Sequence, residues 1–286
     1  MAHLPSLIGG LGEIAKRYDA LICDVWGVLH DGHRAHAPAV EALRRFRAVF
    51  GPVVLLSNAP RPVEVLEEQF ARIGVPADCY DAIVTSGVAT RDALAERANN
   101  RRLAILHIGP VRDRGVFDGL PIDCVDAPKA SAILCTGLYD DDTETPADYA
   151  EMLDELKRRG LTLLCANPDI VVQRGGKLVY CAGALARDYE KMGGQVVYYG
   201  KPYRPIYDMT LAAARKAARR DIARPLAVGD GIETDVKGAN GAGLDALFIA
   251  DGIHGEDIRE FSAEALAALF AKSGVTARAA MRALVW

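Results

Sequence analysis

The chain has 286 residues, of which half are hydrophobic and a quarter are charged, and its formal net charge is −4 at pH 7. This composition indicates a globular protein with enough apolar material for one large or two moderate domains. The slightly acidic balance and the absence of a long basic run disfavour nucleic acid and anionic membranes as partners. The opening stretch, MAHLPSLIGGLGEIAKRY, has no basic start and no unbroken apolar run. We therefore expect no signal peptide, no membrane span and a cytoplasmic location.

Short apolar runs alternate along the chain with segments of helical periodicity. Continuous apolar runs favour strands that are buried on both faces of a parallel sheet. Strands are predicted at 20–24, 52–57, 82–85, 196–199, 225–229 and 244–249. Helices are predicted at 38–48, 62–73, 87–97, 183–192, 203–219 and 233–241, and the tail from 256 onward is predicted to be helical. This alternation predicts an α/β fold with a doubly wound parallel sheet.

A second set of signals interrupts this order and indicates an inserted domain. Strands are predicted at 103–108, 131–135 and 161–165, a helix at 146–159, and a hairpin over 170–180 with Gly175–Gly176 at its turn. We therefore predict a core formed by residues 1–85 and 183–286, and an inserted α/β domain formed by residues 86–182.

Two other patterns have ordinary structural interpretations. The six cysteines occur singly, without C-x-x-C spacing, and are predicted to be reduced, buried thiols. The acidic run DDDTE at 140–144 is interpreted as a loop leading to a helix cap at Thr145 rather than as a metal site.

Polar residues follow several of the predicted core strands at the point where each strand ends. They lie in four segments, Asp24–Gly27, Ser57–Asn58, Lys201–Pro202 and Gly229–Asp235. In an open parallel sheet, ligands bind outside the carboxyl ends of the strands. We therefore expect the side chains of these segments to meet at one edge of the sheet, although they are far apart in the sequence.

The residue types in this set suggest a particular chemistry. The carboxylates of Asp24, Asp230 and Asp235 would repel one another unless a cation lay among them, and Mg²⁺ is commonly held by one or two carboxylates beside a phosphate. Lys201 and Ser57 could contact the other phosphate oxygens. A carboxylate in such a place can attack phosphorus and form an aspartyl-phosphate. Taken singly, these residues could equally be turn formers, helix caps or a surface lysine, so only the set is informative.

The ordered motifs D-x-x-G-V, S-N, K-P and G-D-x-x-x-T-D resemble those of the haloacid dehalogenase superfamily of phosphatases. The long insertion between the second and third motifs resembles the type IIA cap of this superfamily. The segments CANPDI, CAGALARDYE and GKPYRPIYD resemble its NagD-type branch, which includes sugar-phosphate, nucleotide and p-nitrophenyl-phosphate hydrolases. The resemblance covers roughly residues 18–255, and it implies a Rossmann-like core with an inserted cap.

The resemblance implies a role for each acidic residue of the set. Asp24 would be the nucleophile and a ligand of Mg²⁺, and the backbone carbonyl of Trp26 would be a second ligand. Asp230 would bind the same ion, and Asp235 would support it directly or through water.

The resemblance also implies how substrate is held. Ser57 would donate a hydrogen bond to the phosphoryl group, helped by the amide of Asn58, and Lys201 would neutralise both the nucleophile and the phosphate. The substrate would be a small phosphorylated metabolite, selected by the cap, and copies of the chain could associate through the cap.

Trp26 departs from the pattern of the family, because most of its phosphatases carry an aspartate there that protonates the leaving oxygen. An indole N–H cannot do this work, and such general acid–base help is typically worth about 10²–10⁴-fold. The leaving group could need no proton, or His30, Asp31 or Asp169 could replace the aspartate. Alternatively, the protein is a catalytically weak regulatory module that binds phosphate and Mg²⁺.

A third hypothesis is carbon–halogen hydrolysis, in which Asp24 attacks carbon without a metal. The pair Asp230 and Asp235 argues against it, because that reaction needs no cation site.

Overall fold

The computed structural model describes residues 4–99, 101–174, 177–255, 258 and 260–286. The chain divides into two compact units. The first comprises Met1–Ser57, Glu64–Val84 and Lys201–Trp286, and the second comprises Asn58–Val63 and Thr85–Gly200. An inserted α/β domain is thus present, but its boundaries differ from 86–182, because it extends to Gly200 and includes a short segment before Glu64.

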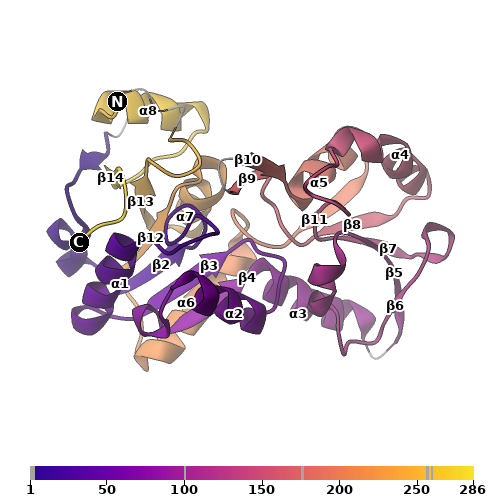
Figure 1. The fold of residues 1–286 in the computed structure, drawn as a ribbon, viewed down its shortest axis with the longest axis horizontal. Coiled ribbons are helices and arrows are strands. Elements are labelled where there is room, and N and C mark those ends of the chain that lie inside the picture. The colour runs from indigo at the N-terminus through magenta and orange to yellow at the C-terminus, as the bar shows by residue number, and fades with distance from the viewer. Residues whose placement is uncertain (1–3, 100, 175–176, 256–257, 259) are drawn as a thin grey trace. The chain divides into compact units, whose positions relative to one another are not determined.

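The first unit is built on a seven-stranded sheet, and almost every residue of its central strands is buried (Figure 1). The strands from β1 to β3 in spatial order are all paired in parallel. The spatial order is β1 (Ser6–Leu7), β14 (Ala279–Met281), β13 (Asp245–Ile249), β12 (Pro225–Gly229), β2 (Ala20–Asp24), β3 (Val53–Ser57) and β4 (Ala82–Thr85).

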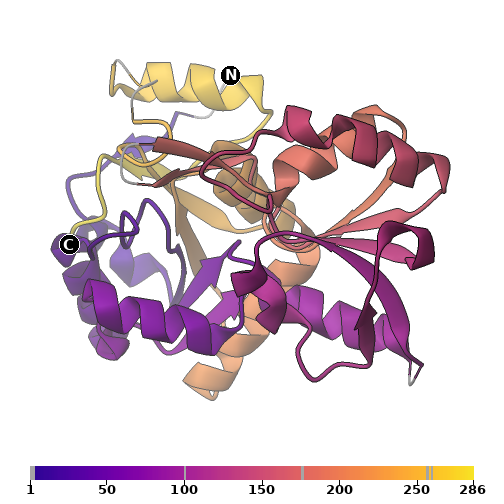
Figure 2. The same ribbon diagram turned by 45° about the vertical axis from the view of Figure 1, so that its right-hand side comes forward.

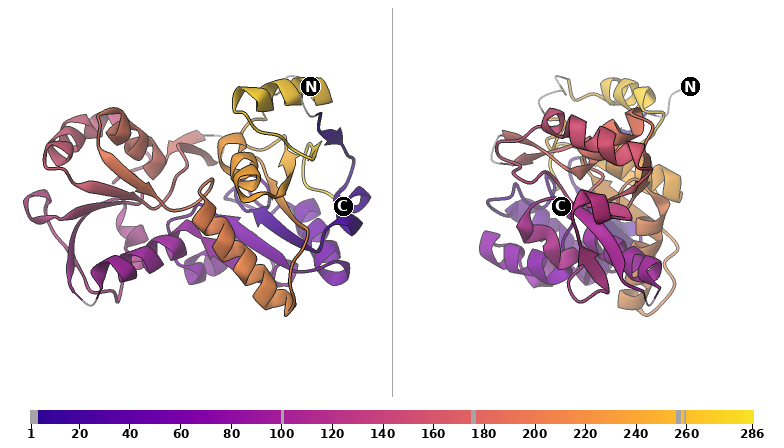
Figure 3. Two further views of the ribbon diagram at one scale, coloured as in Figure 1. Left: turned by 180° about the vertical axis from the view of Figure 1, so that it is seen from behind. Right: turned by 90° about the vertical axis from the view of Figure 1, so that its right-hand side faces the viewer.

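Helices cover both faces of this sheet, so the doubly wound parallel fold is confirmed. Ile22, Val54 and Ala227 are register partners and share one face, where they pack against α6 (Arg204–Ala218), α8 (Ala263–Lys272) and the turn before α7 (Lys237–Ala242). The view from behind shows α6 in front of the strands (Figure 3). The opposite face carries α1 (Ala37–Val49) and α2 (Val63–Ile73) (Figures 1 and 3). The remaining elements of this unit are short, namely η1 (Leu11–Glu13), η2 (Ala15–Arg17), η3 (Ala77–Cys79) and the π-helical turn η7 (Ile232–Val236).

The second unit has a sheet of its own, in which all five strands run parallel. Its order is β11 (Gln195–Tyr198), β8 (Thr162–Cys165), β7 (Ala132–Cys135), β5 (Leu103–Ile108) and β6 (Ile122–Cys124). One face packs against α3 (Ser86–Ala98) and the other against α4 (Ala150–Arg158) and α5 (Ala182–Lys191), as Figure 2 shows. Short 3₁₀ helices connect these elements, namely η4 (Val111–Val116), η5 (Ala127–Lys129) and η6 (Pro146–Tyr149).

The predicted hairpin is present in the second unit. β9 (Val171–Arg174) pairs antiparallel with β10 (Lys177–Tyr180). The residues predicted for its turn, Gly175–Gly176, lie outside the described residues.

Two predictions about the location of elements were wrong. The helix at 183–192 and the strand at 196–199 were assigned to the core, but α5 and β11 belong to the second sheet. Leu185 and Tyr189 of α5 pack on Leu163 of β8, and an apolar periodicity does not say which of two sheets it will cover. The tail is only partly helical, because α8 is followed by β14, which lies between β1 and β13.

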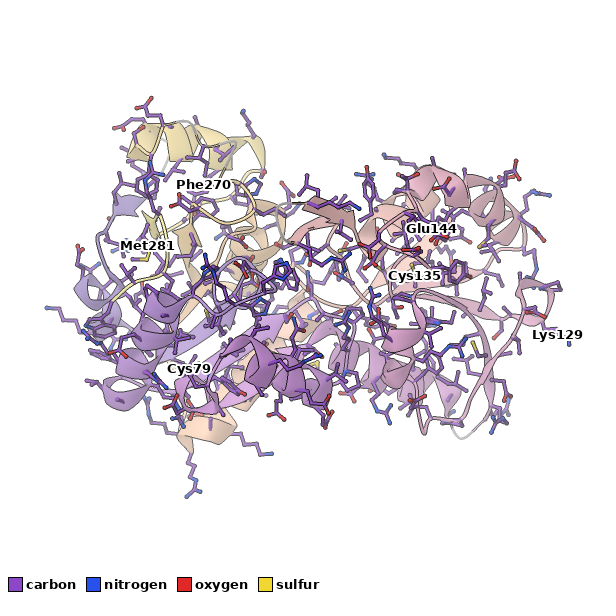
Figure 4. The ribbon with its side chains drawn as sticks, in the orientation of Figure 1. Cys79, Lys129, Cys135, Glu144, Phe270 and Met281 are labelled. Atoms are coloured by element: carbon purple, nitrogen blue, oxygen red, sulfur yellow. The ribbon has the colours of Figure 1, made fainter. Side chains whose placement is uncertain are left out.

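The cysteines are free thiols, as predicted, and all but Cys124 are buried. Cys79 and Cys135, one in each unit, are labelled in Figure 4. Within the part of the chain that the structure describes, no helix combines the length and the apolar character needed to cross a bilayer.

We predict that Phe248→Ala destabilises the first unit by about 3–5 kcal/mol, because it removes a fully buried ring and leaves a cavity. Phe248 lies edge-on to Phe270 of α8, with ring centroids 5.2 Å apart; Phe270 is labelled in Figure 4. Urea unfolding followed by the fluorescence of Trp26 and Trp286, both in the first unit, measures the loss. The control Val49→Ala, at a side chain that is 72% exposed, should change stability by no more than about 0.5 kcal/mol. Equal effects of the two substitutions would contradict this description of the core.

Candidate active site

Three buried carboxylates meet at the carboxyl edge of the first unit's sheet. Asp24 is the last residue of β2, Asp230 follows β12 directly, and Asp235 lies in the π-helical turn after it. β2 and β12 are neighbours in register and end side by side. Each of the three residues offers an oxygen within 4.8 Å of those of the other two. The structure therefore brings together the three acidic residues singled out in the sequence.

Lys201 joins this cluster as its counter-charge. Its Nζ lies 2.5 Å from Asp24 Oδ1 and 2.8 Å from Asp235 Oδ1, and the residue is only 3% exposed. A buried ammonium is stable only when it is paired and hydrogen-bonded. Lys201 is therefore a fixed part of the site and not a solvated surface lysine.

The cluster carries more negative than positive charge. Loss of water on burial, followed by repulsion from Asp235, raises the pKa of both Asp24 and Asp230, although Lys201 opposes the shift. When all three carboxylates are ionised and Lys201 is protonated, the cluster has a net charge of −2. A divalent cation with a preference for oxygen ligands would balance this excess and would favour the ionised carboxylates. The residues of this site therefore fit such an ion.

The backbone around Asp230 is shaped to leave room for its carboxylate. Gly27 has φ +83°, and a Cβ there would come within 2.2 Å of Asp230 Oδ2. A Cβ at Gly252 would come within 2.0 Å of the same oxygen. The N–H of Ile253 donates a hydrogen bond of 2.7 Å to Asp230 Oδ2. The loop after β13 therefore orients Asp230, which the sequence analysis missed. The signal available was that Gly252 follows a core strand at the same edge of the sheet.

Asp235 is held through both of its carboxylate oxygens. Lys201 binds Oδ1, and the N–H of Gly231 donates to Oδ2 at 3.0 Å. A Cβ at Gly229 would come within 2.2 Å of Asp235 Cγ, so glycine is needed for this close approach. Asp235 is thus fixed in place and in turn helps to fix Lys201.

Ser57 and Asn58 follow the neighbouring strand. Ser57 is buried and ends β3, one residue beyond Leu56, which is the register partner of Asp24. Asn58 is the first residue of the chain that belongs to the second unit. There its Nδ2 donates to Asp169 Oδ1 at 2.9 Å. Ser57 thus lies at the edge of the first sheet, and the side chain of Asn58 is held by Asp169.

Trp26 packs within its own loop. Its half-buried indole lies edge-on to the imidazole of His30, with centroids 5.1 Å apart, and close to Gly32. Burial, with a further contribution from His36, lowers the pKa of His30 to about 4. His30 Nδ1 accepts a hydrogen bond from the N–H of Gly32. A neutral imidazole in this state is a poor replacement for a general acid near pH 7.

The other two candidates for that role have structural partners. Asp31 Oδ1 accepts hydrogen bonds from the N–H groups of His33 and Arg34, both at 2.9 Å, as in a turn. Asp169 accepts from Asn58 within the second unit.

A second group of carboxylates, Asp140–Asp142, lies in the acidic loop of the second unit. Asp141 pairs with Arg112 at 2.5 Å, and Arg174 pairs with Asp141 and Asp142. Two of the three carboxylates are thus paired with arginines, in keeping with the interpretation of this run as an acidic loop. The loop leads to Thr145, whose N–H donates to Asp148 at 2.7 Å at the start of η6.

Comparisons with known proteins point to one family of hydrolases. The model of the haloacid dehalogenase-like hydrolases matches residues 21–120, and a second model of this kind, described as HAD-hydrolase-like, matches residues 198–282. A crystal structure of a haloacid dehalogenase-like hydrolase from Brucella suis is 42% identical. It covers 98% of this chain and 100% of its own, with a TM-score of 0.87.

More distant relatives have named activities. The D-glycerol 3-phosphate phosphatase of Mycobacterium tuberculosis is 27% identical over 85% of this chain, and the match spans 65% of that enzyme, a little under two thirds of its length. The ribonucleotide monophosphatase NagD of Escherichia coli is 28% identical over 83% of this chain and 89% of its own. A glycerol phosphate phosphatase from M. tuberculosis, solved in complex with magnesium, has the same fold, with 24% identity, a TM-score of 0.64, and coverage of 84% of this chain and 70% of its own.

These matches confirm the resemblance to the NagD-type branch that the motifs predicted. The chain belongs to the haloacid dehalogenase-like hydrolases.

Proposed function

We propose that this protein is a Mg²⁺-dependent phosphohydrolase that acts on a small phosphorylated metabolite through an aspartyl-phosphate. The observation that carries the proposal is the buried cluster of Asp24, Asp230, Asp235 and Lys201 at the carboxyl edge of the sheet. The names of the relatives, two of which are phosphatases of small metabolites, support the same reaction class.

The metal ligands in this proposal are Asp24, Asp230 and the backbone carbonyl of Trp26, with Asp235 in support, directly or through water. A bound Mg²⁺ would polarise the phosphoryl group and offset the negative charge of nucleophile and phosphate. Gly27 and Gly252 leave the space that Asp230 occupies.

The first chemical step belongs to Asp24. One carboxylate oxygen attacks phosphorus, the bond from phosphorus to the leaving oxygen breaks, and an aspartyl-phosphate forms. Lys201, held between Asp24 and Asp235, offsets the charge that develops on the phosphoryl oxygens. Ser57 and the amide N–H of Asn58 orient the phosphoryl group.

In the second step, water attacks the phosphorus of the aspartyl-phosphate. The bond from phosphorus to Asp24 breaks, the carboxylate is restored, orthophosphate leaves, and the proton of the water passes to solvent. In the first step, the leaving oxygen takes its proton from solvent, because Trp26 cannot supply one and His30 is neutral near pH 7. Aryl and acyl phosphates, whose leaving groups are stable as anions, should therefore react fastest.

Trp26 also favours a second candidate function, that of a regulatory module that binds phosphate and Mg²⁺ but turns over slowly. The two candidates share every binding residue and differ only in rate. In both, the second unit would select the ligand.

The nucleophile is tested by Asp24→Asn. We expect turnover of p-nitrophenyl phosphate to fall by at least about 10⁴-fold, because the side-chain amide of asparagine cannot form the aspartyl-phosphate. The matched control is Asp208→Asn, which removes an exposed carboxylate paired with Arg204 on α6 and should leave turnover unchanged. A variant with Asn at position 24 that retained a tenth of the wild-type rate would rule out this mechanism.

The metal requirement is tested by chelation and by Asp230→Asn. We expect turnover to cease in excess EDTA and to return with added Mg²⁺, since the ion balances two surplus negative charges. Asp230→Asn should raise the Mg²⁺ concentration for half-maximal activity by about 10-fold or more, and calorimetric titration with Mg²⁺ should show the same loss of affinity. Undiminished turnover in EDTA would exclude the metal.

Trp26→Asp tests the missing general acid. The wild type should hydrolyse p-nitrophenyl phosphate much faster than an alkyl phosphate such as glycerol 3-phosphate, whose leaving oxygen needs a proton. The variant should gain about 10²-fold on the alkyl ester, the lower end of what general acid catalysis provides. Its rate on the aryl ester should change by only a few fold. Trp26→Phe, which adds no carboxyl group, serves as the control and should show no gain. Loss of both activities in Trp26→Asp would mean that the indole itself serves the native reaction.

A further inference from the structure

The six residues Asn58–Val63, here called the linking segment, belong to the second unit although both of their neighbours in the chain belong to the first. The segment begins directly after Ser57, at the end of β3, and leads into α2. It therefore continues the chain directly from Ser57, one of the proposed phosphate-binding residues.

The start of the linking segment is held by side-chain contacts. Asn58 is 3% exposed, and its Nδ2 donates to Asp169 Oδ1 at 2.9 Å. A Cβ at Gly200 would come within 2.5 Å of Asn58 Oδ1, so the chain at Gly200 lies directly against this amide. Asn58 thus contacts Asp169 and Gly200, both of the second unit.

Arg61 holds the middle of the segment. Its Nε donates to Asp113 Oδ1 at 2.8 Å, and the Asp113 side chain is only 3% exposed. The carbonyl of Arg61 accepts a hydrogen bond of 2.7 Å from Thr85 Oγ1. The carbonyl of Ala59 accepts one of 3.1 Å from the N–H of Gly87. A Cβ at Gly87 would come within 2.4 Å of the Arg61 nitrogen, so α3 begins in contact with the segment.

These contacts come from four parts of the second unit: the start of α3, the 3₁₀ helix η4, the loop after β8 and the segment after β11. Removing one partner of a buried ion pair is far more costly than breaking an exposed one, because it leaves a charge without compensation. The conformation of the linking segment therefore depends on the body of the second unit.

We propose that Asp113 and Asp169 are positioning residues for phosphate binding. They fix Arg61 and Asn58, and through the backbone of the linking segment they set the place of the Asn58 amide beside Ser57. The inference rests on the proposed function, in which Ser57 and Asn58 bind the phosphoryl group. Under it, the placement of the Asn58 amide, and with it the affinity for phosphate, depends on the contacts that Asp113 and Asp169 make with the linking segment.

The test compares Asp113→Asn and Asp169→Ala with matched controls in the second unit. Asp123→Asn disrupts an exposed pair with Arg102, and Asp188→Ala removes a surface partner of Arg187 and Lys191. For each full-length variant, kcat and KM for p-nitrophenyl phosphate, the inhibition constant of orthophosphate, and hydrogen exchange of a peptide covering 58–63 are measured.

We expect Asp113→Asn and Asp169→Ala to raise KM and the orthophosphate inhibition constant together by about 10-fold, with kcat changed by less than about 3-fold. A raised KM with an unchanged kcat indicates the loss of an interaction that stabilised the bound substrate and the transition state equally. Exchange in 58–63 should become at least about 10-fold faster, while both controls remain like the wild type. If Asp113→Asn does not fold, the inference is tested by Asp169→Ala alone, because Asp169 is only half-buried and its replacement should be better tolerated.

The outcomes separate this inference from the function on which it rests. Suppose that the wild type turns over and that Asp113→Asn and Asp169→Ala have the same KM and orthophosphate inhibition constant as their controls. This result would overturn the inference and leave the proposed function intact. Faster exchange in 58–63 without a change in KM or in phosphate inhibition would also overturn it, since the contacts would then be structural only. If the wild type showed no turnover in the presence of Mg²⁺, the proposed function itself would be contradicted, and the inference that rests on it would fall with it.

Discussion

The pairing of one buried ammonium with two carboxylates is the interaction on which the site depends. Lys201 reaches Asp24 across 177 positions of sequence and also contacts Asp235. Without this cation, three carboxylates could not be buried together at the edge of the sheet, and without the carboxylates the lysine could not be buried. Lys201 binds one oxygen of Asp24 and one of Asp235, and Asp230 accepts a hydrogen bond from the backbone N–H of Ile253. When all three carboxylates are ionised, the two negative charges that Lys201 does not offset would favour a divalent ion among them.

The close packing of backbone against carboxylate makes this arrangement rigid. Gly27 and Gly252 lie against Asp230, and Gly229 lies against Asp235. Each contact is so close that a Cβ on the glycine would clash with the carboxylate. Rigid placement of charged groups lets a site stabilise a transition state without reorganising at the moment of reaction. The glycines are thus as much a part of the site as the acids that they surround.

Much of the fold and of the site could be predicted from the sequence, because both follow from where apolar runs end. The doubly wound sheet and the meeting of Asp24 and Asp230 follow from strands whose carboxyl ends share one edge. Lys201 was expected there because it follows a predicted core strand, but that strand, β11, lies in the second sheet. The assignment of α5 and β11 to the second sheet could not be predicted, because the apolar periodicity of a buried segment is the same whichever sheet the segment joins. β14 was missed because three residues, AAM, carry no periodicity. The grouping of Asn58 with the second unit depends on side-chain pairs that are distant in sequence.

The order of the strands also bears on how the chain folds while it is being synthesised. Once residue 200 has been made, all five strands of the second sheet exist, but the first sheet still lacks β12, β13 and β14. β2 then presents an open edge until β12 emerges to pair with it. Since domains generally fold as units during translation, the inserted unit can fold ahead of the core that surrounds it. Asp230 and Asp235 emerge after that point, so the candidate site is among the last parts of the nascent protein to be assembled.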